Sequence, residues 1–494
     1  MTPVREVALL RGTEGAVACG HPLAAGAGIE ILGEGGGAAD AAVAAAAVLA
    51  VVLPDACGLG GDAMILVRRA GGEALALNGS GAAPSGFQPP VPPDGGGTVG
   101  VPGAVAAWAD LHARFGRIDL DRVLAPSVRI ARNGFAVAGA LLAAVEAQRD
   151  RLTATAAGFA FLAPGLRAGA RIRQPELADM LQRVGADGPD GLYRGEMAEA
   201  IARATGGQVA AADLEAHRTA VLAAVEGAYG DARICVQPPV SQAVLALMVL
   251  RGLEGRDGDA AARTHAAIEL VEAAFAHRDR VAAPDAAAAL LDVALEIDPE
   301  RARRRGGPRG YNHTTAITAA DDEGTVVSML VSVFDDFGSA VLVAEGGFML
   351  NDRLLGFAAD EASPNAAAPG RRPVHTLSPA ILEHDDRVMA IATPGADGQV
   401  QTLVQLVDRV VDRGETVETA LARPRWRSID RRVAIEDGLD AEVADELRRR
   451  GHELLPMPAG DGLFGAACCA GADEATGTLF AAADGRRETW AGVR

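Results

Sequence analysis

Apolar residues follow two spacings in the first half of the chain, one helical and one alternating. The stretch Ala38–Leu53 is nearly all alanine, valine and leucine. It is too short to span a bilayer and predicts a buried helix. Two short apolar runs, Ala63–Val67 and Ala74–Leu77, predict paired strands that turn at the glycines between them. Helical spacing returns at Ala104–Phe115, the first of several predicted amphipathic helices that continue to about Ala282.

A glycine cluster precedes the first of these helices. Ile29–Leu32 has the composition of a short strand, and Gly33–Gly37 leads from it into the helix. The glycines match a dinucleotide-binding fingerprint only loosely, because no acidic strand end follows at the required distance. Close packing of a helix against a strand explains them more simply. We therefore predict no bound nucleotide.

The second half of the chain changes character after a segment rich in arginine and glycine. Pro284–Gly310 predicts an exposed, mobile connection that would suit a cleavage boundary. A β-like stretch then begins at Thr314, turns at Asp321–Gly324 and resumes as Thr325–Val333. The pattern becomes helical again over about Gln399–Ala422.

Composition and charge narrow the function classes. The chain has 494 residues, 49% hydrophobic and 22% charged, which indicates a folded protein with two lobes or one large layered domain. The formal net charge is −19 and no basic stripe with aromatic residues occurs, so nucleic acid is not an expected partner. Lysine is absent from the sequence. This excludes Schiff-base catalysis, pyridoxal phosphate attachment and a phosphate-loop lysine.

The five cysteines lack the spacing of a metal site. They are scattered apart from Cys468–Cys469, with no CxxC pair and no suitably placed histidines. We therefore predict no zinc site, no other metal and no cofactor. Residues 1–7 lack the apolar core of a signal peptide, and no apolar run is long enough for a membrane span. The expectation is a soluble, cytoplasmic protein.

Thr314 and Thr315 stand where a cleavage would create a nucleophile. They lie within Tyr311–Ile317, directly after the segment expected to be mobile. An internal threonine here would be an ordinary strand residue. If the bond between His313 and Thr314 is cut, Thr314 carries both a hydroxyl and an α-amine whose unperturbed pKa is about 8. That amine can accept the hydroxyl proton near neutral pH.

Ordered motifs along nearly the whole chain resemble the γ-glutamyltranspeptidase family of N-terminal-nucleophile hydrolases. The matching motifs are Gly35–Ala44, Gly58–Asp62, Val101–Val105, Phe115–Arg117, Glu269–Ala273, Arg278–Arg280 and Phe337–Ser339. The resemblance implies an α+β fold, a four-layer αββα sandwich with a helical lobe. It also implies a precursor that cleaves itself between His313 and Thr314. Residues 1–313 would form the large subunit and residues 314–494 the small subunit, both contributing to one core.

The same resemblance implies catalytic roles for five residues. Thr314 is the nucleophile, Thr315 helps to position its α-amine, and Ser332 matches the hydroxyl that hydrogen-bonds the nucleophile. Gly395 and Ala396 match a glycine pair whose N–H groups form the oxyanion hole. Alanine has the same backbone N–H as glycine, so the hole can survive this change.

Residues that read a γ-glutamyl group in the family are replaced here. Ser80 stands in place of an arginine that holds the glutamyl carboxylate, and Phe334 in place of an asparagine. Gly356 replaces an acidic residue that binds the substrate amine. An arginine–carboxylate contact consists of several charge-assisted hydrogen bonds, so its loss argues against glutathione as the substrate.

Other motifs resemble the acylase-like and oxamate-amidohydrolase-like branch of the family. They are Gly60–Asp62, Asn78–Gly81, Arg372–Thr376 and Gly395–Gln399. That branch hydrolyses small amides, which implies an amide hydrolase that works through an acyl-enzyme. Arg353 matches a substrate-contacting position and is the candidate partner of a substrate carboxylate. His375 and Thr376 occupy the position of a serine pair that fixes the substrate.

Other functions stay open at this point. One is a γ-glutamyl hydrolase or transferase that acts on glutathione-like compounds. Another is a relative that never cleaves itself and only binds or assembles, because the third residue of the small subunit, usually histidine, is Ala316. Separately, Ser332 has an alternative as a plain strand residue, His375 as a structural histidine and Arg353 as a surface ion-pair partner. Acyl transfer beside hydrolysis and a homo-oligomer also stay open.

Overall fold

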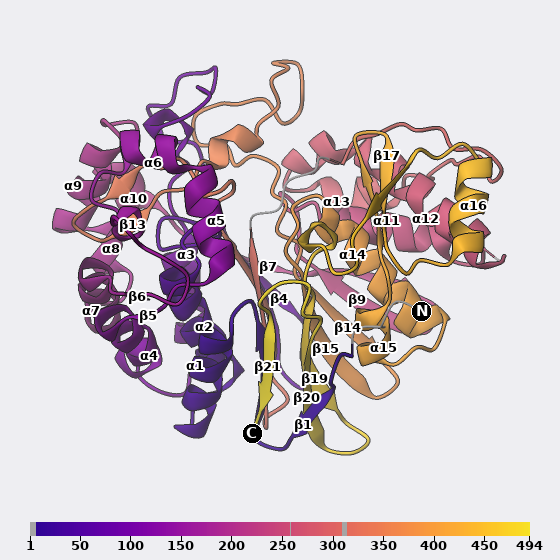
Figure 1. The fold of residues 1–494 in the computed structure, drawn as a ribbon, viewed down its shortest axis with the longest axis horizontal. Coiled ribbons are helices and arrows are strands. Elements are labelled where there is room, and N and C mark those ends of the chain that lie inside the picture. Colours follow the sequence, from indigo (N-terminus) through magenta and orange to yellow (C-terminus); the bar gives the residue numbers. More distant parts are fainter. Residues whose placement is uncertain (1–5, 257, 309–313) are drawn as a thin grey trace.

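Two seven-stranded antiparallel sheets form the centre of the molecule, and helices cover their outer faces (Figure 1). The computed structural model describes residues 6–256, 258–308 and 314–494. The first sheet consists, edge to edge, of β1 (Leu10–Gly12), β20 (Thr478–Ala483), β19 (Cys468–Asp473), β15 (Arg387–Ala392), β14 (Ala380–His384), β9 (Ala232–Val236) and β8 (Val225–Tyr229). The second consists of β21 (Trp490–Val493), β2 (Gly15–Cys19), β10 (Thr315–Asp321), β11 (Val326–Ser332), β3 (Asp62–Arg68), β4 (Leu75–Gly79) and β7 (Ala220–Ala223).

Both sheets mix strands from the two sides of the 313/314 position. The first sheet takes β1, β8 and β9 from before it, and the second takes β2, β3, β4 and β7. The remaining strands of each sheet follow Thr314. Neither part of the chain completes a sheet without the other.

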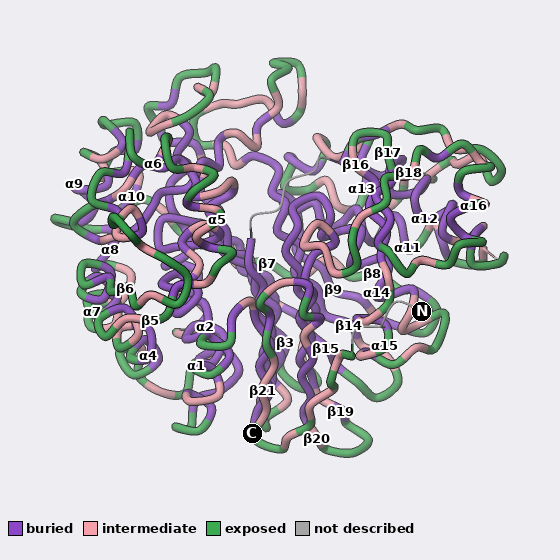
Figure 2. Tube along the Cα trace, viewed as in Figure 1, coloured by how far each residue is buried: buried purple, intermediate pink, exposed green. Residues whose placement is uncertain are grey.

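Alternation along the central strands builds the layers. In β10, Ala316 and Ala320 face the first sheet, whereas Ile317 and Ala319 pack against helices. This period of two is expected for a strand covered on both faces, and it leaves the centre of the sandwich buried (Figure 2). The predicted α+β fold and its αββα layering are confirmed.

The helices fall into two groups, one on each outer face. The group over the second sheet contains α1 (Pro22–Gly33), α2 (Ala38–Val52), α3 (Ala104–Phe115), α4 (Leu120–Asn133), α5 (Gly139–Ala147), α6 (Arg149–Thr155), α7 (Pro175–Asp187), α8 (Asp190–Tyr193), α9 (Gly195–Ala204) and α10 (Ala211–Ala216). The group on the side of the first sheet contains α11 (Val244–Leu253), α12 (Ala260–Phe275), α13 (Ala286–Leu291), α14 (Gly398–Val407), α15 (Val417–Ala422) and α16 (Ala441–Arg449). Within the described ranges, no helix combines the length and apolar character needed to cross a membrane.

Three small sheets lie outside the sandwich. The three-stranded one beside α12 and α16 contains β16 (Trp426–Ile429), β17 (Arg432–Glu436) and β18 (Leu454–Met457). Two further pairs join β5 (Phe135–Ala136) to β6 (Arg171–Ile172) and β12 (Leu342–Val343) to β13 (Phe348–Met349).

The structure differs from one prediction about local structure and refines another. Ile29–Leu32 is the end of α1 and not a strand, because the helix already begins at Pro22, with His21 accepting a hydrogen bond from the Leu23 N–H. Most described residues of the segment Pro284–Gly310 are exposed or half-buried, as predicted. The segment nevertheless contains α13, and Gly306 and Pro308 are buried.

Candidate active site

Strand register brings three polar side chains together at one end of three central strands of the second sheet. β10 and β11 pair with Thr315 opposite Val331, so the next step places Thr314 opposite Ser332. β11 and β3 pair with Ser332 opposite Asp62. Thr314, Ser332 and Asp62 therefore lie side by side at the ends of three neighbouring strands, although long stretches of sequence separate them.

The Thr314 hydroxyl lies within hydrogen-bonding reach of Ser332. Its Oγ1 donates to Ser332 Oγ at 3.4 Å, and Ser332 Oγ accepts from the Phe334 N–H at 2.9 Å. Thr314 is only 3% exposed. The side chain of Thr315 packs against Gly20, where a Cβ would lie 2.0 Å from the Thr315 Oγ1. His313, the residue predicted before the cleaved bond, lies outside the described residues.

Gly395 and Ala396, the predicted N–H donors, lie in a turn whose carbonyl groups are held by hydrogen bonds. It follows β15 and precedes α14, with positive φ angles of 123° and 50°. The Gly395 carbonyl accepts from Arg427 Nη2 at 2.9 Å, and the Pro394 carbonyl accepts from the Thr393 hydroxyl at 3.1 Å. A trans peptide points its N–H away from its C=O. Holding these two carbonyls therefore fixes the directions of the Ala396 and Gly395 N–H groups.

Asp62 holds a buried ion pair and a histidine together. Asp62 Oδ2 accepts from Arg353 Nε at 2.6 Å and from His375 Nε2 at 3.3 Å, and all three side chains are fully buried. His375 Nδ1 accepts from the Leu377 N–H at 3.2 Å, so the ring is neutral and carries its proton on Nε2. Burial alone would raise the pKa of Asp62, but the charge of Arg353 and the contact with His375 lower it to about 2. The carboxylate stays ionised.

Arg353 keeps two donors without acceptors. Its Nη1 and Nη2 are buried and have no hydrogen-bond partner among the described residues. The Phe334 ring lies 4.5 Å from the guanidinium carbon, and Phe334 itself has a φ of 85°. The surface ion pair considered for Arg353 is thus wrong, because the side chain is fully buried. This guanidinium can therefore still donate hydrogen bonds to an acceptor.

Within the described part of the chain, Ser80 forms no hydrogen bond with this guanidinium. Its hydroxyl donates to Asn78 Oδ1 at 2.6 Å and its carbonyl accepts from Arg372 Nε at 2.8 Å. The next residue, Gly81, donates its N–H to Asp62 Oδ1 at 3.0 Å. The turn containing Ser80 therefore contributes to the site by holding Asp62.

Gln242 and Asp62 are site residues that sequence reasoning did not single out. Gln242 Nε2 donates to the carbonyls of Thr376 and Ala396 at 3.4 and 3.3 Å, and so ties the His375–Thr376 segment to the N–H donor turn. Arg278 Nε donates to Gln242 Oε1 at 3.1 Å. No local pattern marks Gln242. The signal for Asp62 was a carboxylate at the start of an otherwise apolar strand.

A cavity of about 470 Å³ lies next to this group. Phe334, two residues after Ser332, and Asp397, directly after Ala396, both line it. The cavity is therefore lined by residues that flank Ser332 and Ala396 in the sequence, although neither of these two residues lines it. Its other charged lining residues are Arg278, Asp279, Asp335 and Asp360.

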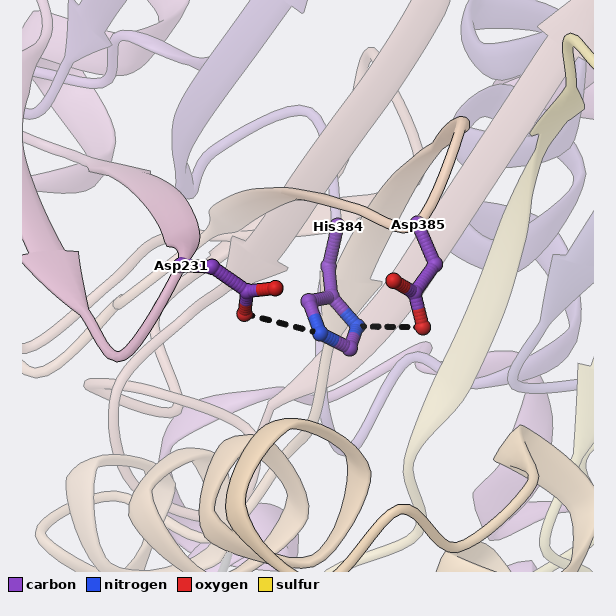
Figure 3. Close-up of side chains that lie close together, drawn as sticks. All are labelled: Asp231, His384 and Asp385. Atoms are coloured by element: carbon purple, nitrogen blue, oxygen red, sulfur yellow. Dashed lines mark ion pairs between the residues drawn. The ribbon is translucent and has the colours of Figure 1, made fainter.

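A second polar group lies at the far end of the β14–β15 hairpin (Figure 3). His384 Nε2 lies 3.1 Å from Asp231 Oδ1, and its Nδ1 lies 3.6 Å from Asp385 Oδ2. Both aspartates are largely exposed. Gly395 follows the opposite end of the same hairpin, so this group is remote from Thr314 and takes no part in the site.

Buried neutral histidines predict acid lability. Burial lowers the pKa of His375 from 6.5 to about 4, and the charge of Arg353 adds to the shift. Burial likewise lowers the pKa of His21, His217 and His452 to about 4. Between pH 6.5 and pH 4 these histidines are protonated in the unfolded chain but neutral in the folded chain. The free energy of unfolding therefore falls as the pH drops from 6.5 to 4. The ionised Asp62 carboxylate contributes to the free energy of unfolding down to lower pH, and this contribution is lost between pH 3.8 and about 2.

Melting temperatures measured from pH 8 to pH 4 test this expectation. We expect the melting temperature to be constant above pH 7 and to fall below pH 6.5. In His375→Gln, the decrease in the free energy of unfolding between these pH values should be smaller than in the wild type by at most about 3 kcal/mol. The difference between variant and wild type on the plateau isolates the packing effect of the substitution. A constant melting temperature from pH 7 to pH 4 would contradict the buried neutral state.

Comparisons with known proteins agree on one family. The family model described as Gamma-glutamyltranspeptidase matches residues 24–493. The chain is 32% identical over 455 residues to the oxamate amidohydrolase proenzyme of Klebsiella pneumoniae, covering 84% of this chain and 85% of that protein. It is 30% identical to the acylase ACY 1 proenzyme of a Pseudomonas species, covering 90% and 88%. The crystal structure of cephalosporin acylase from Bacillus halodurans superposes with a TM-score of 0.90 at 29% identity, covering 100% and 98%.

Proposed function

The chain belongs to the γ-glutamyltranspeptidase family and is an amide hydrolase of that family; on this premise we propose that it matures by cutting itself before Thr314 and then uses Thr314 as its nucleophile. The observation that carries the proposal is the strand register that sets the Thr314 hydroxyl against Ser332, beside Asp62. The proenzyme relatives support the maturation step.

In the proposed self-cleavage, Thr314 Oγ1 attacks the carbonyl carbon of the preceding peptide bond. The new C–O bond replaces the C–N bond, and the hydroxyl proton ends on the released α-amine. Water then hydrolyses the ester, leaving a carboxylate on the large subunit and a free amine on Thr314. Ser332 accepts the hydrogen bond that orients Oγ1 for this attack.

In the mature enzyme the same hydroxyl attacks an amide substrate. The α-amine of Thr314 takes the hydroxyl proton and gives it to the leaving amine, so the acyl group is carried as an ester. Water repeats the attack and releases the acid. The N–H groups of Gly395 and Ala396 stabilise the oxyanion in both steps. Loss of one such donor typically lowers the rate by about a hundredfold or more.

The substrate proposed is a small amide whose acyl half carries a carboxylate. The buried Arg353 with two unsatisfied donors supports an anionic partner, and Asp62 fixes the guanidinium by its Nε. The oxamate amidohydrolase relative acts on an amide of this kind by its name. Ser80, at the family's carboxylate-clamp position, cannot form an ion pair, which weighs against γ-glutamyl substrates.

A panel of amides tests the proposed function. The purified, processed protein should hydrolyse oxamate or a related carboxylate-bearing amide, whereas γ-glutamyl-4-nitroanilide should release no 4-nitroaniline. Addition of glycylglycine separates transfer from hydrolysis, because an acceptor accelerates only a transferase. Turnover of the γ-glutamyl substrate without oxamate turnover would replace the proposal with a γ-glutamyl hydrolase or transferase. A chain that stays intact and inactive would mark a non-enzymatic relative.

A further inference from the structure

One face of α12 carries three buried polar residues that the proposed mechanism does not use. His265, Glu269 and Glu272 lie at positions i, i+4 and i+7 of the helix, so they share one face. Their exposed fractions are 1%, 0% and 2%. Buried carboxylates are costly unless they are paired or hydrogen-bonded, so these side chains need partners.

Each of the three side chains has a main-chain partner in residues 298–308, which we call the strap, and Glu269 also forms an ion pair with the Arg305 side chain at 3.6 Å. His265 Nε2 donates to the Asp298 carbonyl at 2.8 Å. Glu269 Oε1 accepts from the Arg303 N–H at 3.0 Å, and Glu272 Oε2 accepts from the Gly306 N–H at 3.2 Å. The three contacts follow the same order along the helix and along the strap. The strap therefore runs along α12 and is hydrogen-bonded to it at residues 298, 303 and 306.

The opposite side of the strap is held by residues next to the small sheet β16–β17–β18. The Ala302 N–H donates to the Arg450 carbonyl at 2.7 Å, and the Asp430 N–H donates to the Pro308 carbonyl at 3.2 Å. Ser428 Oγ in β16 donates to Glu272 Oε1 at 2.7 Å, which joins the two sides. A Cβ on Gly307 would lie 2.9 Å from Phe275 Cβ in α12, so the strap and the helix pack closely.

The strap ends close in sequence to the proposed cleavage site. Five residues of sequence separate Pro308 from Thr314, which directly precedes β10. The bond proposed to be cut therefore lies between two fixed positions of the chain, and releasing Pro308 would leave only one of them. The orientation of reacting groups strongly affects the rate of an intramolecular attack.

We propose that Glu269 and Glu272 are positioning residues for self-cleavage, because they fix the strap, the described part of the large subunit that precedes the bond proposed to be cut. The inference rests on the proposed self-processing. After the cut, the same contacts keep the end of the large subunit attached to α12 and the small sheet. Neither glutamate touches the reacting atoms, so both act through the strap.

The first test is the rate at which freshly purified full-length precursor converts to two fragments on a denaturing gel. The double variant Glu269→Ala/Glu272→Ala should convert about tenfold more slowly or slower still. Misplacing reacting groups by about 1 Å can lower a reaction rate about a hundredfold. The pair Glu269→Gln with Glu272→Gln keeps an acceptor at each position and should react at an intermediate rate. Ile268→Ala is the matched control, because Ile268 is fully buried in the same helix but packs into the apolar core.

Limited trypsin digestion gives a readout that loss of stability alone would not move. The strap contains Arg303, Arg304 and Arg305, and its main chain is hydrogen-bonded, so the wild type should resist cutting there. The alanine pair should be cut at these arginines at temperatures well below melting, whereas Ile268→Ala should stay resistant. The glutamine pair provides the same comparison if the alanine pair does not fold.

The outcomes separate the inference from the function on which it rests. A wild type that cleaves before Thr314, with the alanine pair cleaving equally fast, overturns the role of the strap and leaves the proposed function standing. Slowing of the alanine pair and of Ile268→Ala in proportion to their losses of melting temperature also overturns it. A wild type that never cleaves overturns both.

Discussion

Thr314→Ala should leave the protein as one intact 50.4 kDa chain without amide hydrolase activity. The substitution removes the oxygen that attacks in self-cleavage and again in each turnover. Without cleavage the α-amine of residue 314 also stays locked in a peptide bond and cannot act as a base. Loss of a nucleophile of this kind costs on the order of 10⁶ in kcat. Intact mass measurement after long incubation, together with an amide hydrolysis assay, checks both effects.

Thr318→Ala is the matched control for this variant. Thr318 lies four residues further along, within β10, which begins directly after Thr314, and it is also buried. Its hydroxyl donates to the Ala18 carbonyl at 3.3 Å, remote from the reacting atoms. The control should cleave and hydrolyse as the wild type does. Cleavage of Thr314→Ala at the same bond would refute the assignment of the nucleophile.

Arg353→Gln should lower kcat/KM for a carboxylate-bearing amide by about a hundredfold to ten-thousandfold. The loss corresponds to two hydrogen bonds from a charged donor, each contributing about 1.5–3 kcal/mol, with tenfold for every 1.4 kcal/mol. A neutral amide of the same size should lose less than about tenfold, because it never used the charge. Initial rates on the two substrates, compared for wild type and variant, measure the difference.

Two further variants separate recognition from folding. Removing Arg353 leaves Asp62 as a buried unpaired charge, which typically destabilises a protein by about 3–5 kcal/mol. Arg353→Gln combined with Asp62→Asn removes both charges and should recover melting temperature without recovering activity on the anionic amide. Arg353→Lys keeps the charge but not the planar fork, and should lie between wild type and Arg353→Gln. Equal losses on the anionic and neutral amides would argue against a carboxylate site.

The elements that sequence predicted well are those whose local pattern agrees with their environment. The helix predicted at Ala104–Phe115 is α3, and that predicted at Ala38–Leu53 is α2 without its last residue. The apolar residues of both helices lie in the buried layer between helix and sheet, where removing them from water stabilises the fold. Ile29–Leu32 failed because a few apolar, partly β-branched residues look alike in a strand and in the last turn of a longer helix.

The ordering of the strap was not predicted, for a related reason. Its arginines and glycines are typical of exposed loops, and its arginine side chains are exposed or half-buried. The ordering comes from its main chain, which Glu269, Glu272, Arg450 and Asp430 hold by hydrogen bonds. Backbone contacts to distant residues leave no trace in the composition of the segment that is held.

By itself, the sequence determined the family, the layered α+β fold and the position of the candidate nucleophile, because ordered motifs and apolar periodicity are properties of the chain read in order. Only the tertiary structure decided which residues meet. It set Thr314 opposite Ser332 and beside Asp62, buried Arg353 with two free donors, and laid the strap along α12. Strand register and the desolvation of charges depend on residues far apart in the chain, so no local pattern could have revealed them.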